Sequence, residues 1–216
     1  MATSKLQLYN VALAACGERQ LDSLTEDRDP RYMLDEVYNR GNGAITYFLE
    51  QGLWNFATRV VQIDADTSVS VAFGWSNAFG KPDDFVRLVQ ISADEYLNLP
   101  LNRYELRQSY FYADIDPLYL AYVSDDSSWG SDFSLWPDTF ALWAGYYLAT
   151  QIGPRLKNDL DMERLEKRTK RYLVDARSKD AQQEPTRFSP PGSWVNARHS
   201  GRTGRRDRGP RNTLLS

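Results

Sequence analysis

Apolar residues recur at helical spacing near both ends of the chain and at strand spacing in its middle. At the N-terminal end, Ser4 and Gln7 form a capping box that starts a helix. One face of this helix is apolar until Gly17 stops it, and its members are Leu6, Tyr9, Leu13 and Cys16. The spacing predicts a short first helix with Cys16 as a small core residue.

A second helix is predicted from Asp29 to Gly52. Asp29 followed by Pro30 is a helix start signal, because proline suits the first helical position. Gly41 and Gly43 weaken the helix at its middle, which indicates close packing or a kink there. They do not indicate a nucleotide-binding loop, since no strand precedes them. The apolar stripe of this helix is Leu34, Val37, Tyr38, Ile45, Phe48 and Leu49.

Between residues 59 and 124 the apolar residues fall into short runs rich in Val, Ile, Tyr and Phe. Turn residues separate these runs, as in FGKPDD and DIDP. The pattern predicts an antiparallel sheet of at least four strands. The runs are RVVQI, DFVRLVQIS, ELRQSYFYA and LYLAYVS.

Helical spacing returns after Pro137 and predicts two more helices. The first has a wide aromatic face that includes Trp143 and ends at Gly153 and Pro154; the second runs from about Asp159 to Ala181 and is amphipathic. The expected fold class is α+β. We expect a four-helix bundle-like body from residues 1–58 and 134–182, an inserted small antiparallel β-sheet domain at 59–133, and an extended basic C-terminal arm at 183–216.

The charge of the chain is segregated. The whole chain has a formal charge of −3. The segment from Gln183 to Ser216, however, contains seven Arg and only two acidic residues, Glu184 and Asp207. Between Val60 and Phe140, by contrast, there are thirteen Asp and Glu but only four Lys and Arg. A basic, Arg- and Gly-rich terminus is typical of a solvated arm that becomes ordered on an anionic partner. A disordered solubility tail is the alternative.

Composition excludes several classes of protein. No stretch approaches the roughly 18 apolar residues of a membrane span, and the N-terminus does not resemble an export signal, so we expect a soluble, unexported protein. Cys16 is the only cysteine, and His199, the only histidine, lies in the arm. The expected folded part therefore lacks the usual general base and the commonest metal ligand.

Acidic pairs and tryptophans are the remaining candidates for chemistry. Most of the pairs flank predicted turns, where Asp makes local backbone hydrogen bonds; they are Asp64 with Asp66, Asp83 with Asp84, Asp114 with Asp116, and Asp125 with Asp126. In the Trp-rich stretch, Trp143 fits the helix core, whereas a sugar-stacking role remains an alternative for Trp129. We expect no enzymatic activity, no cofactor and no metal.

Seven segments, in order from Leu6 to Arg198, carry a family resemblance. They are LYNVALAACGE, SLTEDRDPR, LEQGLWNFATR, KPDDFVR, YADIDPLYLAYVS, LWPDTF, and ARSKDA followed by RFSPPGSWVNAR. Together they resemble the tail tubular protein A family of short-tailed phages and related prophages, which are head-to-tail adaptors. Residues 199–216 fall outside the resemblance.

The resemblance implies a structural virion protein at the head–tail interface, assembled in the host cytoplasm. It implies a dodecameric ring that docks below the portal protein and receives the tail nozzle, with tail fibres as further candidate neighbours. Genomic DNA would pass through the lumen of the ring.

The arm is the candidate portal-binding site. Phe188 and Trp194 are aromatic anchors on a stiff Pro-Pro segment, and the arginines beyond them can pair with portal carboxylates. The candidate residues are Phe188, Pro190, Pro191, Trp194, Arg198, Arg202, Arg205, Arg206, Arg208 and Arg211. Two other classes stay open: a nucleic-acid-binding protein that uses the arm on phosphates, and a carbohydrate hydrolase or binding module.

Overall fold

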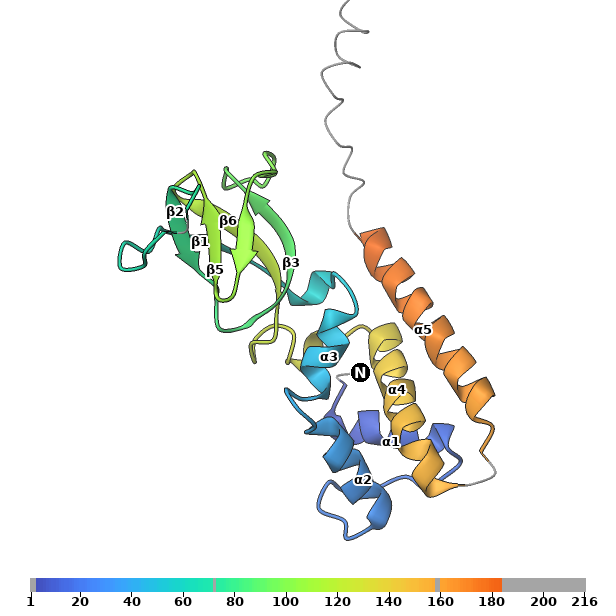
Figure 1. Cartoon of the computed structure of the whole chain (residues 1–216). Helices are drawn as coiled ribbons and strands as arrows, with labels where there is room; N and C mark the ends of the chain where they lie inside the picture. Colours follow the sequence, from blue (N-terminus) through green and yellow to red (C-terminus); the bar gives the residue numbers. More distant parts are fainter. Residues whose placement is uncertain (1–2, 72, 158–159, 184–216) are drawn as a thin grey trace, which may run out of the picture. The chain divides into compact units, whose positions relative to one another are not determined.

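The computed structural model describes residues 3–71, 73–157 and 160–183 (Figure 1). Three helices precede the strands: α1 (Lys5–Ala15), α2 (Asp29–Tyr38) and α3 (Ala44–Glu50). Two follow them: α4 (Asp138–Leu156) and α5 (Met162–Gln183). All six described strands lie between α3 and α4. The expectation of a mixed α+β protein is confirmed, while the predicted arm from residue 184 onward lies outside the described residues.

The helix predicted from Asp29 to Gly52 is two helices, so the prediction of one helix is wrong. The break comes at Gly41 and Gly43, whose φ angles are +61° and +91°. Positive φ is strained for residues with a Cβ atom, so two glycines let the chain turn where a helix would otherwise continue. The described residues therefore contain five α-helices where four were expected.

The start of α1 is confirmed, and the end of α4 is not where the sequence predicted it. The Ser4 Oγ accepts a hydrogen bond from the Gln7 N–H at 3.2 Å, as expected for a capping box. In α4 the helix passes Gly153 and Pro154 and ends at Leu156. Gly153 is buried against the chain leading into α5, where a Cβ atom would lie 2.8 Å from Leu160 Cδ2. It therefore serves close packing rather than helix termination.

The helical core is built around aromatic side chains. Trp54 and Trp143 are both almost fully buried, and their rings lie 6.3 Å apart. Phe140 meets Trp54 edge-on at 4.7 Å, and Phe48 meets Trp143 edge-on at 5.4 Å. Cys16 is buried in the same core, with its Sγ 3.7 Å from the Ala149 carbonyl oxygen. The predictions that Trp143 and Cys16 are core residues are confirmed.

The strands form two small antiparallel sheets rather than one. One sheet has the order β1-β6-β3, from β1 (Thr58–Ile63), β6 (Leu118–Ser124) and β3 (Phe85–Ser92). The other has the order β2-β5-β4, from β2 (Asn77–Gly80), β5 (Tyr110–Ala113) and β4 (Glu105–Arg107). Side chains of both sheets share one apolar cluster, which includes Phe79, Phe111, Leu120 and Tyr122. We call this pair of sheets the sandwich.

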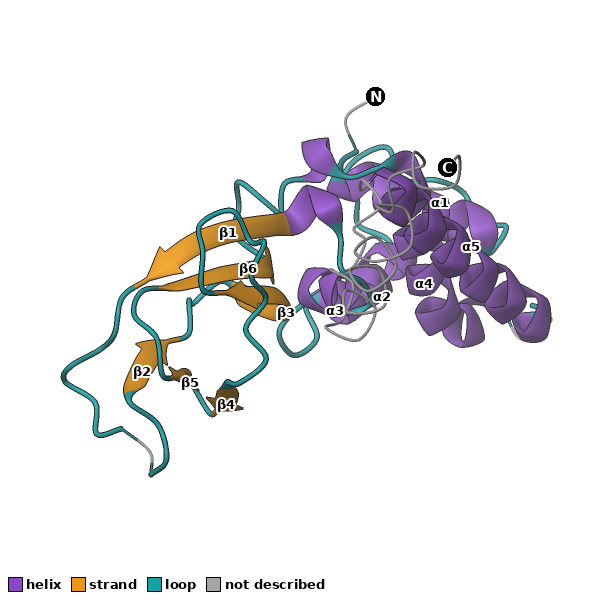
Figure 2. Ribbon diagram, turned by 90° about the horizontal axis from the view of Figure 1, so that it is seen from above, coloured by secondary structure: helices purple, strands orange, loops and turns teal. Residues whose placement is uncertain are grey.

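Residues 1–183 cluster as one compact unit because the sandwich is tied to the helices. β3 contacts α3 (Figure 2), and the Arg87 guanidinium donates to the Glu50 carbonyl at 2.9 Å. At the end of α5, the buried Asp180 carboxylate accepts the Asn55 N–H at 3.2 Å. The Asn55 amide in turn donates to the Asp180 carbonyl at 2.8 Å. The last turn of α5 is thereby fixed to the segment that leads into β1.

Candidate functional site

The portal-binding residues predicted in the arm all lie outside the described residues. The structure therefore does not place them against one another or against the folded part. They are Phe188, Pro190, Pro191, Trp194, Arg198, Arg202, Arg205, Arg206, Arg208 and Arg211.

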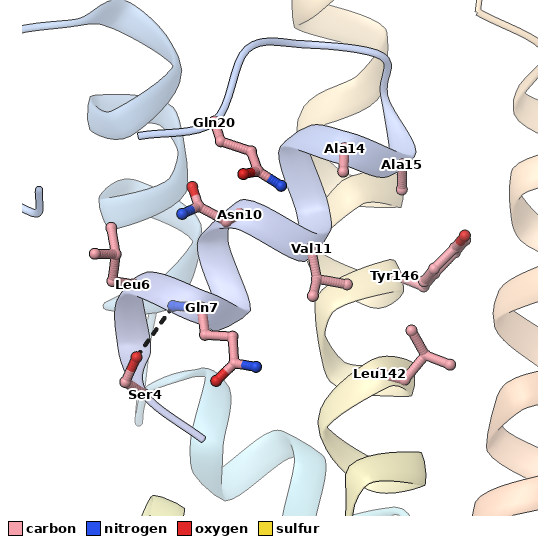
Figure 3. Close-up of a pocket in the computed structure, with 10 residues that line it drawn as sticks. All are labelled: Ser4, Leu6, Gln7, Asn10, Val11, Ala14, Ala15, Gln20, Leu142 and Tyr146. Carbon is pink, nitrogen blue, oxygen red and sulfur yellow. Dashed lines mark hydrogen bonds between the residues drawn. The ribbon is translucent and has the colours of Figure 1, made fainter. Parts of the chain in front are cut away.

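A groove lies between α1 and α4 (Figure 3). It has a volume of about 590 Å³, and an adjoining hollow of about 470 Å³ shares Gln7, Val11 and Leu142 with it. We call the two together the α1–α4 groove. The larger part is lined by Ser4, Leu6, Gln7, Asn10, Val11, Ala14, Ala15, Gln20, Leu142 and Tyr146.

Close contact of two helices forms the floor of the groove. Gly145 of α4 lies against α1, and a Cβ atom there would be 2.5 Å from Val11 Cγ1. Gln7, Val11 and Ala14 follow the i, i+4, i+7 spacing along α1, so they line one side. Leu142 and Tyr146 are four residues apart on α4 and line the other side (Figure 3).

Residues at both ends of the groove also contact other parts of the chain, and these contacts fix their positions. The Tyr146 ring meets Tyr172 of α5 edge-on at 4.7 Å. Burial, and then the neighbouring Tyr172, raise the pKa of Tyr146 above its ordinary value, so this side chain is a neutral wall. The Asn10 amide exchanges two hydrogen bonds with the backbone of Leu21, which holds the loop carrying Gln20 beside α1. The groove is thus a preformed surface.

The larger part of the groove is uncharged in a chain that is 25% charged. Every residue around its larger part is apolar or neutral, and Asp138 is the only charged residue around the adjoining hollow. Along α4, no charged residue occurs between Asp138 and Arg155. A helix with so little charge and so many apolar residues is normally covered on most of its sides. The lack of charge along α4 is visible in the sequence, but the sequence does not show which part of the helix borders a groove.

A hydrogen-bonded carboxylate at Asp84 joins all three strands of the first sheet. It accepts from the Arg59 guanidinium of β1 at 2.9 Å, and from the hydroxyls of Tyr122 and Ser124 of β6 at 2.8 and 2.5 Å. Burial raises the pKa of Asp84, but the hydrogen bonds from Ser124, Tyr122 and Arg59 outweigh it and hold the pKa below its ordinary value. The arrangement holds a partly buried anion at the start of β3, with each of these hydrogen bonds made to the chain itself.

The other acidic pairs also bond within the chain. Asp66 accepts from the Ser68 N–H at 2.9 Å, Asp114 from the Ser76 N–H at 3.1 Å, and Asp126 from the Ser128 N–H at 2.8 Å. The Asp66 and Asp126 contacts are local turn hydrogen bonds, as predicted, whereas Ser76 lies 38 positions from Asp114, so that bond joins two distant segments. Within the described ranges, no group of three or more His, Cys, Asp or Glu side chains could hold a metal ion. Trp129 is half-buried in the loop before α4.

The outer face of α5 is basic, with seven exposed Lys and Arg against three exposed Asp and Glu in the helix. Some of its basic residues form ion pairs with acidic residues of the same helix. Lys167 pairs with Glu163 at 3.3 Å and Arg171 with Asp175 at 4.0 Å. In sequence this helix runs directly into the basic arm. The exposed basic residues are Arg164, Lys167, Arg168, Lys170, Arg171, Arg177 and Lys179.

Comparison with known proteins gives no family assignment: no protein-family model and no curated protein sequence matches the chain. Of the helices described here, none is both long and apolar enough to cross a membrane.

Proposed function

We propose that the protein is a head-to-tail adaptor of a short-tailed phage or prophage, one subunit of a dodecameric ring between the portal and the tail nozzle. The observation that carries the proposal is the order of seven segments that resemble the tail tubular protein A family from Leu6 to Arg198. In this role the chain is a structural virion protein without enzymatic activity, and DNA passes through the lumen of the ring.

Features of the described residues support a role in assembly. A ring subunit buries different surfaces against its two neighbours, and the cores of such interfaces are depleted in charge. The α1–α4 groove, which has Asp138 as the one charged residue of its described lining, has this character. The acidic segment between Val60 and Phe140 suits a channel wall, because negative charge repels DNA phosphates and lets the genome slide.

The first expected result concerns assembly. Isolated protein should sediment as a monomer or weak oligomer, and rings should appear in negative-stain images only after portal protein is added. The reason is that residues before the arm carry a net charge of −8, so identical subunits repel each other until a template aligns them. A stable large ring of isolated protein at micromolar concentration would contradict this.

A second expected result concerns the arm as a portal tether. Trp194→Ala should weaken portal binding by about 2 kcal/mol at every salt concentration, because a buried aromatic anchor is insensitive to screening. Replacing Arg205, Arg206 and Arg208 together with Gln should weaken binding mainly at low salt, where exposed ion pairs are least screened. Deletion of residues 188–216 should leave the helices and sandwich folded, since α5 ends at Gln183. It should abolish the attachment of tails to filled heads.

The measurement is binding of these three variants to purified portal across a salt series. Circular dichroism of each variant controls for folding. If the truncated protein binds portal as well as the full chain does, the tether proposal is lost and the arm returns to the DNA-binding or solubility alternatives.

Nucleic-acid binding is the second candidate function, and the basic face of α5 favours it. That face and the arm follow one another in the sequence, so together they could track a phosphate backbone. Such binding needs no portal and weakens steeply as salt is added. Titration of the full chain with double-stranded DNA between 50 and 200 mM salt therefore separates the candidates, and a loss of about 10³-fold over this range would favour the nucleic-acid role.

A further inference from the structure

The loop between β1 and β2 presents apolar side chains to solvent. The sequence has no charged residue from Thr67 to Gly80. Phe73 is fully exposed and Val71 is 37% exposed. Apolar residues occupy alternate positions in this part of the chain. We use the name apolar loop for these four residues: Val69, Val71, Phe73 and Trp75. It stands out from the strands in Figures 1 and 2. Phe73 and Val71 are two exposed apolar side chains on one uncharged stretch, and exposed apolar groups that lie together mark interaction surfaces.

Hydrogen bonds hold both ends of this loop to the sandwich. At the first end, the Asp66 N–H donates to the Ala78 carbonyl at 2.8 Å. At the other end, the Trp75 indole N–H donates to Glu105 at 3.0 Å, and the Arg103 guanidinium lies over the Trp75 ring at 5.2 Å. Phe73 is therefore presented on an anchored base and remains available to another molecule.

The apolar loop and the α1–α4 groove match each other chemically. The chain as a whole is 25% charged, yet the loop has no charge and the larger part of the groove has none. One surface projects and the other is hollow, with about 590 Å³ beside Val11 and Leu142. This volume is within the range of roughly 300–1,000 Å³ in which proteins hold apolar ligand groups. It is large enough for an aromatic ring and a neighbouring side chain.

We propose that the apolar loop of one copy, led by Phe73, docks in the α1–α4 groove of a second copy. This inference rests on the proposed function, in which many copies lie side by side. The larger part of the groove offers no opposite charge to a charged partner, whereas a second copy carries an uncharged projection. Loop and groove are different surfaces, so the contact is heterologous and can repeat around a ring.

Disulfide trapping in the full chain tests this contact, even where association is weak. Protein with Phe73→Cys is mixed with protein with Ala14→Cys, and both sites are exposed, so neither change disturbs the core. The native Cys16 is buried and is changed to Ala in both proteins. A disulfide forms only where Cα atoms come within about 7 Å, so the 73–14 cross-link should exceed the control by at least about fivefold. Mass spectrometry of the linked peptides provides the measurement.

The control pair is Phe73→Cys mixed with Gln151→Cys, because Gln151 is exposed on α4 outside the groove. A second test uses sedimentation of concentrated protein. Phe73→Asp should lower self-association, whereas Leu106→Asp, at an exposed position on β4, should leave it unchanged. A 73–14 cross-link no stronger than the control overturns the proposal, as does self-association that Phe73→Asp leaves intact.

The test separates this inference from the adaptor function, because portal-templated rings are imaged with the same samples. Rings of the unmodified protein without enrichment of the 73–14 cross-link would leave the adaptor function standing and overturn the docking. A strong cross-link in a protein that never binds portal would support the docking and overturn the adaptor function.

Discussion

Asp84→Ala should lower the free energy of unfolding by about 2–4 kcal/mol, because it leaves buried partners without their acceptor. The hydroxyls of Tyr122 and Ser124 both donate to this carboxylate, and both residues are fully buried. The Arg59 side chain is 37% exposed, so water compensates part of the lost ion pair and the effect should stay below that of a fully buried ion pair. Urea unfolding followed by circular dichroism provides the measurement.

The same carboxylate should make the protein sensitive to acid. Its pKa is lower in the folded chain than in the unfolded chain. The stabilisation is therefore complete above the unfolded value of about 3.9 and is lost as pH falls through the folded pKa. Asp84→Ala should remove this part of the acid dependence, so the difference in stability between wild type and variant should shrink below about pH 4.

Asp83 provides the matched control, since it is the exposed neighbour in the same turn. Asp83→Ala should change stability by no more than about 0.5 kcal/mol. Asp84→Asn should fall between wild type and Asp84→Ala, because an amide keeps one acceptor oxygen but loses the charge. Equal effects of Asp83→Ala and Asp84→Ala would show that the hydrogen bonds at Asp84 do not stabilise the sheet.

Local signals predicted the elements whose ends depend on nearby residues. Ser4 with Gln7 and Asp29 with Pro30 marked the starts of α1 and α2, because caps act within one helical turn. The sequence was less informative where contacts between distant segments determine whether an element forms and where it ends. Gly153 resembled a helix stop, but α4 continues past it because the glycine makes room for Leu160. β2 was missed, since the four residues Asn77–Gly80 are too short to show alternation and are defined by pairing with β5.

The features of the candidate site also differ in how far the sequence alone predicts them. Charge segregation and composition are properties of the sequence alone, so the basic arm could be proposed without a structure. The α1–α4 groove could not, because it depends on Gly145 bringing α4 against Val11 of α1. Similarly, Asp84 was one of several adjacent acidic residues in the sequence. Only strand pairing places it beside Tyr122 and Ser124, which are about forty positions away along the chain.

Trp143→Ala should be the most destabilising single change considered for the helical core, at about 3–5 kcal/mol. Trp143 is 2% exposed, and its ring contacts Phe48 at 5.4 Å and Phe140 at 5.5 Å. Removing the indole would leave a cavity between α3 and α4 that rigid neighbouring rings cannot fill. Urea unfolding should show a lower midpoint with the slope unchanged.

Trp129→Ala is the informative comparison, because Trp129 and Trp143 belong to the same Trp-rich stretch but differ in burial. Trp129 is only half-buried, so its loss should cost about 1 kcal/mol or less. The carbohydrate alternative predicts something else: Trp129→Ala would then leave stability intact but abolish binding on a glycan array. If neither wild type nor variant binds glycans, and Trp143→Ala alone unfolds readily, the stretch serves the core and the carbohydrate alternative is excluded. If Trp143→Ala costs no more than Trp129→Ala, the aromatic cluster does not hold the helices together, and the stability of the body must come from contacts outside it.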